Sequence, residues 1–281
     1  MNIGIVGLGL MGGSIAMALK EKHTVFAYDR SPENSQYGLD HLLINEVCPD
    51  VARLGEKADI VYLCLYPEAI SPFIKSNQKY FRPNTILIDI SGTKSRLVSD
   101  LSPLIRDDLD LIFTHPIAGK EKTGVRFADK QIFTNQNYVI VPTPKNQSDH
   151  LSLVEQLALD MGFKTISYLS ADEHDEIIAF TSQLCHVLAL ALMEAAPKKY
   201  PLKKFVGDSF RDLTRVALIN TPLWQELFLD NKANLINQID TLVNALEKYR
   251  KAIKNHDRVK LVDMMEKAKY LRLQMEKEVT R

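Results

Sequence analysis

The chain opens with Asn2-Ile-Gly-Ile-Val-Gly7-Leu-Gly9-Leu-Met-Gly12, and this stretch decides the fold. Its apolar residues 3–6 predict a β-strand, and the spacing Gly-x-Gly-x-x-Gly predicts a tight turn into a helix over residues 10–19. A second apolar run over residues 24–28 ends at Asp29. A strand, a glycine turn, a helix, a second strand and an acidic residue follow one another in this order in dinucleotide-binding units.

Each part of this pattern has a physical role in holding a cofactor. Gly7 allows the tight turn, Gly9 leaves room for a pyrophosphate, and Gly12 lets the helix lie close to the strand. The helix N-terminus offers free N–H groups to the phosphates. Because the flanking elements all agree, we favour a cofactor site over a glycine turn used for packing alone. The residues assigned to cofactor binding are Gly7, Leu8, Gly9, Leu10, Met11, Gly12, Asp29, Arg30, Tyr66 and Pro67.

The residue after the second strand bears on the choice between NAD and NADP. Asp29 is placed to accept hydrogen bonds from a ribose 2′-hydroxyl, and its charge repels a 2′-phosphate. Arg30 can instead attract that phosphate. On balance the sequence favours NAD.

The composition excludes several classes of protein. The 281 residues include 35 Lys and Arg and 35 Asp and Glu, so no net charge favours nucleic acid or an anionic membrane. The three cysteines are widely spaced, which disfavours a disulfide framework and fits a reducing compartment. No set of His, Cys, Asp and Glu has metal-ligand spacing. Since the first strand begins at residue 2, we expect no signal peptide and a cytoplasmic protein.

The pattern along the chain predicts an α/β protein with two domains. Expected strands at 58–65, 85–89 and 109–115 alternate with helices, which indicates a doubly wound, Rossmann-type parallel sheet. Two further strands, at 137–141 and 164–168, extend it, whereas residues 41–57 show no regular pattern. We therefore expect a dinucleotide-binding domain over 1–167 and an all-α helical domain over 168–281.

The expected helical domain begins at Ser170-x-x-Glu173, which is a capping-box pattern. The apolar stretch Ile177–Ala196 contains several polar side chains, so we expect a buried helix of a soluble protein rather than a membrane span. Shorter helices are expected at 208–219 and 221–229. A heptad-like apolar stripe begins at Leu235 and predicts packing against helices of this chain or of a partner.

Candidate chemistry gathers where the strands end, because ligands of open parallel sheets bind at the carboxyl ends of the strands. His115 ends an apolar strand there, so we expect its imidazole to face the cofactor. A histidine in this place can accept a proton from a hydroxyl group while hydride leaves the same carbon. A purely structural hydrogen bond at the end of the strand is the alternative.

Two clusters in the helical region also suggest a site. Asp175, Ala179, Ser182 and His186 share one face of an otherwise apolar helix, and such polar groups need partners or a ligand. A satisfied internal polar network is the alternative. Further along, Arg211, Asp212 and Arg215 lie within one helical turn, where an Asp-held guanidinium forms a fork for a carboxylate. An ordinary helix ion pair is the alternative there.

Together these stretches resemble the prephenate and arogenate dehydrogenase family of tyrosine biosynthesis. The matching segments are residues 7–16, Asp89–Lys94, His115-Pro-Ile-Ala-Gly-x-Glu121, His174-Asp175 to Ser182-Gln-Leu-Cys-His186, and Phe210-x-Asp212-x-Thr-Arg215 to Trp224. They span nearly the whole chain, and the His-Pro-x-Ala-Gly and Ser-x-Leu-x-His segments are the more specific ones.

The resemblance implies an NAD-dependent oxidative decarboxylation of prephenate to 4-hydroxyphenylpyruvate by a homodimer. His115 would be the catalytic histidine that bonds the ring hydroxyl of the substrate. Arg215 would bind a substrate carboxylate and Asp212 would hold Arg215. His186 and Glu121 would line the substrate site, and Trp224 would lie near the pocket and dimer interface.

One position departs from the family pattern. Many members carry serine at the fourth position of the segment that starts at Asp89, and here that position is Gly92. Ser91 or Thr93 could supply the missing hydroxyl, so we include Ser91 and Gly92 among the substrate-site residues.

Three alternatives remain open. The first is arogenate as the substrate, in which an amino group takes the place of the keto group of the prephenate side chain. A β-hydroxyacid dehydrogenase would need a lysine early in the helical segment, and residues 170–197 contain none. A non-catalytic dinucleotide-sensing dimer would not need His115, His186 and Arg215 together.

Overall fold

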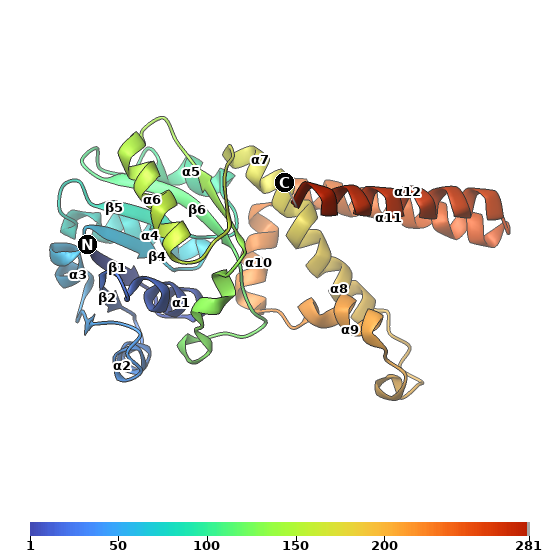
Figure 1. Ribbon diagram of the computed structural model, residues 1–281, viewed down its shortest axis with the longest axis horizontal. Coiled ribbons are helices and arrows are strands. Elements are labelled where there is room, and N and C mark those ends of the chain that lie inside the picture. The colour runs from blue at the N-terminus through green and yellow to red at the C-terminus, as the bar shows by residue number, and fades with distance from the viewer. Residues whose placement is uncertain (280–281) are drawn as a thin grey trace. The chain divides into compact units, whose positions relative to one another are not determined.

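One eight-stranded sheet forms the framework of the computed structural model, which describes residues 1–279. The strands run in the order β3-β2-β1-β4-β5-β6-β7-β8 (Figure 1). Their bounds are β1 (Asn2–Val6), β2 (Thr24–Tyr28), β3 (Glu46–Val47), β4 (Ile60–Leu63), β5 (Ile86–Asp89), β6 (Asp110–Ile117), β7 (Asn137–Val141) and β8 (Thr165–Tyr168). The reversal of strand order at β1 confirms the predicted doubly wound, Rossmann-type fold.

The sheet differs from the prediction in two respects. β6 and β7 pair antiparallel and β7 and β8 pair parallel, so the last two strands run against the other six. In addition, residues 41–57, which show no regular sequence pattern, form β3 and the helix α3 (Val51–Lys57). Both elements of this segment are short, and β3 has only two residues, so neither produces a periodic signal.

Helices cover both faces of the sheet because successive strand residues point to opposite faces. One core joins strand residues such as Ile5 and Ile88 to α1 (Leu10–Leu19) and α6 (Ser148–Asp160). The other core joins residues such as Val61 and Leu87 to α3, α4 (Pro67–Asn77) and α5 (Ser95–Leu101). The helix α2 (Pro32–Asp40) follows β2. With both faces covered, the carboxyl ends of the central strands are left as the place for a ligand.

A long helical segment follows the sheet. It consists of α7 (Ala171–Ile178), the π-helical turn η4 (Ala179–Gln183) and α8 (Leu184–Glu194). Its start confirms the predicted capping box, because the Ser170 side chain bonds the Glu173 backbone and the Glu173 side chain bonds back to Ser170. The helix α9 (Asp208–Thr214) and the 3₁₀ turn η6 (Arg215–Ala217) pack against α8, and α10 (Thr221–Asp230) follows (Figure 1).

The segment Ala171–Glu194 is also, by length and composition alone, apolar enough to cross a membrane, with a mean hydropathy of 1.6. No other helix among residues 1–279 passes that test. Only 28% of its apolar window is buried within the chain, so the prediction of a buried helix holds for part of it. Ile178 and Leu184 are buried, whereas Ile177 and Phe180 are exposed.

The chain divides into two compact units, residues 1–232 and 233–281. In this division by contacts, α7 to α10 belong to the unit that contains the sheet. The second unit comprises most of α11 (Lys232–Lys254) together with α12 (Arg258–Val279). Several residues of the predicted apolar stripe are exposed in the single chain, including Leu246, Ile253 and Met265.

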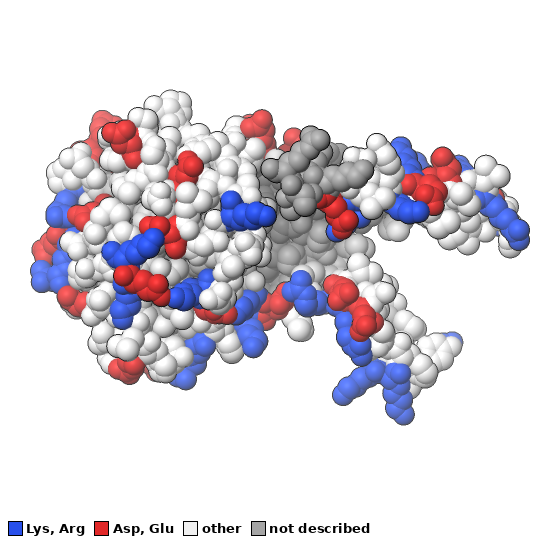
Figure 2. All heavy atoms as spheres, viewed as in Figure 1, with Lys and Arg blue, Asp and Glu red and all other residues white. Residues whose placement is uncertain are grey.

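Charged side chains of both signs are interspersed on the surface. On the face shown in Figure 2, the blue and red side chains of the sheet-containing unit alternate without a large area of one sign. This distribution matches the equal numbers of acidic and basic residues.

Candidate active site

The turn between β1 and α1 is shaped by glycines with different functions. Gly7 has a φ of +95°, and a Cβ atom there would lie 2.5 Å from the Cys64 carbonyl oxygen. A Cβ atom on Gly12 would lie 2.0 Å from the Gly7 carbonyl oxygen, so the fold itself requires both glycines. A Cβ atom on Gly9 would meet nothing within 4 Å. Gly9 therefore leaves open space before the N–H groups of α1, and these residues fit a bound pyrophosphate.

Asp29 is held beside this turn at the end of β2. One carboxylate oxygen accepts a hydrogen bond from the Leu8 backbone N–H at 2.6 Å. The other accepts one from the Ser31 backbone N–H at 2.7 Å. Leu8 is buried, whereas Arg30 is exposed and Leu10 and Met11 are half-buried. This arrangement ties Asp29 to the glycine turn.

Tyr66 and Pro67 lie where α4 begins, shortly after β4, which is the strand next to β1. Pro67 is buried in the first turn of α4, and Tyr66 is exposed. The Tyr66 hydroxyl oxygen accepts a hydrogen bond from the Asn220 side chain at 2.7 Å. This contact links the segment after β4 to the residue that precedes α10.

His115 lies within β6 rather than at its end, which corrects the predicted strand boundary. β5 pairs with β6 only as far as Phe113, but the antiparallel partner β7 continues the ladder to Ile117. His115 therefore lies two residues beyond the last residue paired with β5, and its side chain is half-buried. The extended strand still brings it past the carboxyl end of β5.

The imidazole of His115 contacts a second histidine that the sequence analysis left without a role. Its Nδ1 lies 2.9 Å from Nε2 of His174, and Nδ1 of His174 lies 2.8 Å from Oδ1 of Asp175. Both His174 and Asp175 are buried. The Asp175 carboxylate also accepts the backbone N–H groups of Lys94 at 2.9 Å and of Ser95 at 2.8 Å. Asp175 thus has the internal polar partners that were the alternative to a ligand.

The segment after β5 lies next to the other ring nitrogen of His115, Nε2. A Cβ atom on Gly92 would lie 3.7 Å from Nε2 of His115. The Ser91 hydroxyl donates to Asp89 at 3.0 Å and the Thr93 hydroxyl donates to Asp230 at 3.3 Å. Both hydroxyls are therefore used elsewhere, and the structure gives neither a contact with His115.

A buried ion pair fixes this segment. Nζ of Lys94 lies 2.5 Å from Oδ2 of Asp89, and it also donates to the Ser91 carbonyl oxygen at 2.7 Å. Both charged side chains are fully buried. Burial lowers the pKa of Lys94, although the neighbouring Asp89 opposes that change. Such a pair is costly to break because one partner would be left as an unpaired buried charge.

The electrostatics of the site keep its histidines neutral. Burial lowers the pKa of His115 well below 6.5, and His174 and Lys94 lower it further. Burial likewise lowers the pKa of His174 and of His186. His115 is therefore unprotonated on one ring nitrogen at neutral pH, as a proton acceptor must be.

His186 packs on the single tryptophan of the chain. The ring centroids of His186 and Trp224 are 3.6 Å apart, and Nδ1 of His186 lies 2.9 Å from the Ser182 carbonyl oxygen. The π turn interrupts the helical face predicted from a period of 3.6 residues. Gln183 is consequently the buried polar residue, and it donates to the Leu227 carbonyl oxygen at 3.0 Å.

Arg215 pairs with a different acid from the one predicted. Its guanidinium donates to the Glu121 carboxylate, on the loop after β6, and no ion pair joins it to Asp212 within the described residues. α9 ends at Thr214, and Arg215 begins the 3₁₀ turn η6, so the assumed helical spacing from Asp212 to Arg215 does not continue. Arg211 instead pairs with Asp208.

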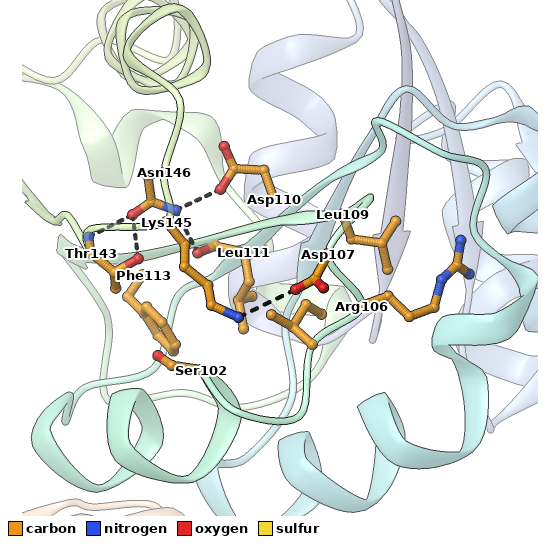
Figure 3. Close-up of a pocket in the computed structure, with 11 residues that line it drawn as sticks. Ser102, Arg106, Asp107, Leu109, Asp110, Leu111, Phe113, Thr143, Lys145 and Asn146 are labelled. Atoms are coloured by element: carbon orange, nitrogen blue, oxygen red, sulfur yellow. Dashed lines mark hydrogen bonds and ion pairs between the residues drawn. The ribbon is translucent and has the colours of Figure 1, made fainter.

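A separate pocket lies at the amino end of β6 (Figure 3). Asp110 and Asn146 bond to each other there, and Lys145 lies 3.6 Å from Asp107. His150 of α6 contacts the buried Asp110 carboxylate at 2.9 Å. Since ligands of parallel sheets bind at the carboxyl ends, this pocket is not the candidate active site.

Two family models match the chain. The nucleotide-binding domain of prephenate dehydrogenase matches residues 15–167, and the prephenate dehydrogenase dimerization domain matches residues 170–267. The chain belongs to the prephenate dehydrogenase family. The predicted family and the assignment as a dehydrogenase are thereby confirmed, and the β-hydroxyacid and non-catalytic alternatives are set aside.

Individual members of the prephenate dehydrogenase family resemble the chain over nearly its whole length. Cyclohexadienyl dehydrogenase of Zymomonas mobilis is 28% identical over 280 residues, which cover 97% of this chain and 95% of that protein. Prephenate dehydrogenase of Bacillus subtilis is 25% identical over 273 residues, which cover 94% of this chain and 73% of that protein.

A solved member of the prephenate dehydrogenase family has the same fold. The prephenate dehydrogenase of A. aeolicus, in complex with hydroxyphenyl propionate and NAD+, is 28% identical with a TM-score of 0.88. The match covers 98% of each chain. The prediction of a dinucleotide cofactor agrees with the nucleotide-binding family model, and NAD is the cofactor in that relative.

Proposed function

We propose that the chain is a cytoplasmic, NAD-dependent prephenate dehydrogenase that converts prephenate to 4-hydroxyphenylpyruvate and carbon dioxide. The observation that carries this proposal is the position of His115, whose Nε2 lies next to Gly92 beyond the carboxyl end of β5. Relatives with prephenate dehydrogenase names and an NAD-bound solved relative support it.

The residues of the chain supply the proton acceptor and the positioning groups. NAD, when bound, would supply the acceptor for the hydride of the ring carbon that carries the hydroxyl group. His115 accepts the hydroxyl proton at Nε2. The bond to the ring carboxylate breaks and carbon dioxide leaves, and the electron pair of that bond makes the ring aromatic. The proton on Nε2 then returns to the phenolate oxygen, which gives 4-hydroxyphenylpyruvate and the neutral His115. Because His115 is neutral and partly shielded from water, it holds a free lone pair for that proton. Aromatisation makes the step effectively irreversible.

Arg215 and His186 complete the proposed substrate site. Arg215 is mostly exposed and pairs with Glu121, so a substrate carboxylate can replace Glu121 as the partner of the guanidinium. His186 and Trp224 together form an aromatic surface next to this position. Asp212, which does not hold Arg215, is left out of the proposed site.

The two parts of the chain divide these tasks. We propose that residues 1–167 bind the cofactor, through Gly7–Gly12, Asp29 and the Tyr66-Pro67 turn. Residues 168–281 would supply Arg215 and His186 and form a homodimer. Exposed apolar residues of α8 and of α11 and α12 support a partner subunit, as does the match to a dimerization domain.

The test is a measurement of reduced nicotinamide with purified protein, in which prephenate and arogenate are each combined with NAD and with NADP. We expect turnover with prephenate and NAD. Turnover only with arogenate would show that prephenate is not the substrate. Turnover only with NADP would contradict the proposed role of Asp29 in binding NAD. No turnover in any combination would refute the proposal. The variant His115→Asn should lose turnover and keep cofactor binding.

A further inference from the structure

Two buried groups, His174 and Asp175, form a row with the proposed proton acceptor His115. The row runs from Nδ1 of His115 to His174 at 2.9 Å, and from His174 to Asp175 at 2.8 Å. The three residues come from β6 and α7, which are far apart in the sequence. Each contact needs one donor and one acceptor, so the position of every proton in the row can be worked out from its far end.

Asp175 sets the direction of the row. Burial opposes its ionisation, but the bonds from His174 and Ser95 outweigh burial and lower the pKa of the carboxyl group. An ionised carboxylate only accepts hydrogen bonds, and it accepts the Lys94 and Ser95 backbone N–H groups as well. His174 must therefore donate its Nδ1–H to Asp175.

The next proton follows from the neutrality of His174. Burial lowers the pKa of His174, so the ring carries a single proton, which is the one on Nδ1. Its Nε2 then has a lone pair and accepts a hydrogen bond. The donor at 2.9 Å is Nδ1–H of His115. A neutral His115 with its proton on Nδ1 has no proton on Nε2, the nitrogen that borders Gly92.

We propose that His174, held by Asp175, is a positioning residue that keeps the proton of His115 on Nδ1 and leaves Nε2 as the base. This inference rests on the proposed function, in which Nε2 takes the hydroxyl proton. After that transfer, both nitrogens of His115 carry protons, and Nδ1–H still points at His174. The ionised Asp175 at the end of the row then stabilises the new positive charge.

A structural role for His174 makes different predictions. If His174 and Asp175 only joined α7 to α5, loss of His174 would lower the stability of the protein. The ring of His115 could then hold its proton on either nitrogen with no effect on the catalytic rate. A positioning role ties the proton position of His115 to the catalytic rate. The two roles can be separated because they can be read out independently.

The first measurement needs no catalysis. Nitrogen NMR of the 281-residue protein with isotope-labelled histidine distinguishes a protonated ring nitrogen from an unprotonated one. The spectrum of His115→Asn identifies the signals of His115 among the seven histidines. We expect Nδ1 of His115 to be protonated and Nε2 to be unprotonated. The opposite assignment would overturn the proposal, whether or not the enzyme uses prephenate.

The second measurement uses two substitutions of His174. His174→Leu removes both hydrogen bonds and should lower kcat by roughly 10²-fold, the usual contribution of a general base, with unchanged affinity for NAD. His174→Gln can accept from His115 and donate to Asp175, and should restore kcat to within about tenfold of the wild type. A folded His174→Leu variant with wild-type kcat would overturn the proposal, as would a folded His174→Gln variant no better than His174→Leu.

The matched control is His150→Leu. His150 also contacts a buried aspartate, Asp110, at 2.9 Å, but it does so at the amino end of β6. This variant should leave kcat and the His115 signals unchanged. A failure of the proposed function would appear differently, as wild-type protein with the expected proton on Nδ1 but no turnover with any substrate.

Discussion

Gly92 faces His115 so closely that a Cβ atom on Gly92 would lie 3.7 Å from Nε2 of the imidazole. The same Cβ atom would lie 3.1 Å from a methyl group of Leu227 on α10. Because residue 92 is a glycine, no side chain at this position lies against Nε2 of the proposed base. A serine at this position would place a hydroxyl group there, and the glycine of this chain does not.

We expect Gly92→Val to lower kcat/KM at least about tenfold, because its methyl groups would fill the space in which the substrate hydroxyl meets Nε2. NAD affinity should not change. Gly207→Val is the control, since a Cβ atom there would meet nothing within 4 Å. Steady-state kinetics and NAD titration check this, and a Gly92→Val enzyme with wild-type kcat/KM would contradict the assigned position of the substrate.

Arg215→Ala should raise the KM for the substrate by about 10- to 100-fold, which corresponds to the loss of a charged hydrogen bond. Arg211→Ala is the matched control, because Arg211 lies one turn earlier and pairs with the exposed Asp208. Asp212→Asn should also leave KM unchanged, since no ion pair joins Asp212 to Arg215. Equal effects of Arg211→Ala and Arg215→Ala would argue against a specific role for Arg215.

The glycine turn allows affinity and stability to be tested separately. Gly9→Ala should weaken NAD binding by about tenfold, or 1.4 kcal/mol, and leave thermal stability unchanged, because its methyl group would enter open space. Gly12→Ala should instead destabilise the protein by about 1–3 kcal/mol, because its methyl group would overlap the Gly7 carbonyl oxygen. Thermal unfolding and NADH titration of both variants check this pair. If Gly9→Ala bound NAD normally, the phosphates could not lie against that turn.

The pH dependence of kcat/KM follows from the lowered pKa of His115. Only the neutral form accepts a proton, and burial lowers the pKa of His115 well below 6.5. As the pH falls through 6.5, most of the enzyme should therefore remain in the active form, and kcat/KM should decline only at more acidic pH. A pH series with a constant-ionic-strength buffer measures this. An acid limb centred at or above pH 6.5 would show that His115 is solvated or that another group controls the rate.

Much of the fold could be predicted because its signals are local. The glycine spacing after β1 requires a turn that only glycines fit, and the alternation of short apolar runs with helical patterns indicates a doubly wound sheet. Ser170 and Glu173 form the capping box that their spacing predicts, because both partners lie within one turn. The elements β3 and α3 were not predicted, because each is too short to produce a local periodic signal.

The direction of β7 and the register of the helix at Ala179 were not predictable in this way. A strand has the same alternating pattern whether its neighbour runs parallel or antiparallel, so the reversal at β7 depends on the whole sheet. The π turn adds a residue to one helical turn and shifts the polar face from Ser182 to Gln183. A uniform period of 3.6 residues cannot reveal that shift.

By itself the sequence determined the cofactor-binding unit, the family and the residue types of the candidate site, because motifs and periodicity are properties of neighbouring residues. Only the tertiary structure decided the partners of those residues. Arg215 meets Glu121, 94 residues earlier, and His115 meets His174, 59 residues later. Hydrogen bonds act over about 3 Å, and the packing of the sheet and helices sets such distances between remote segments.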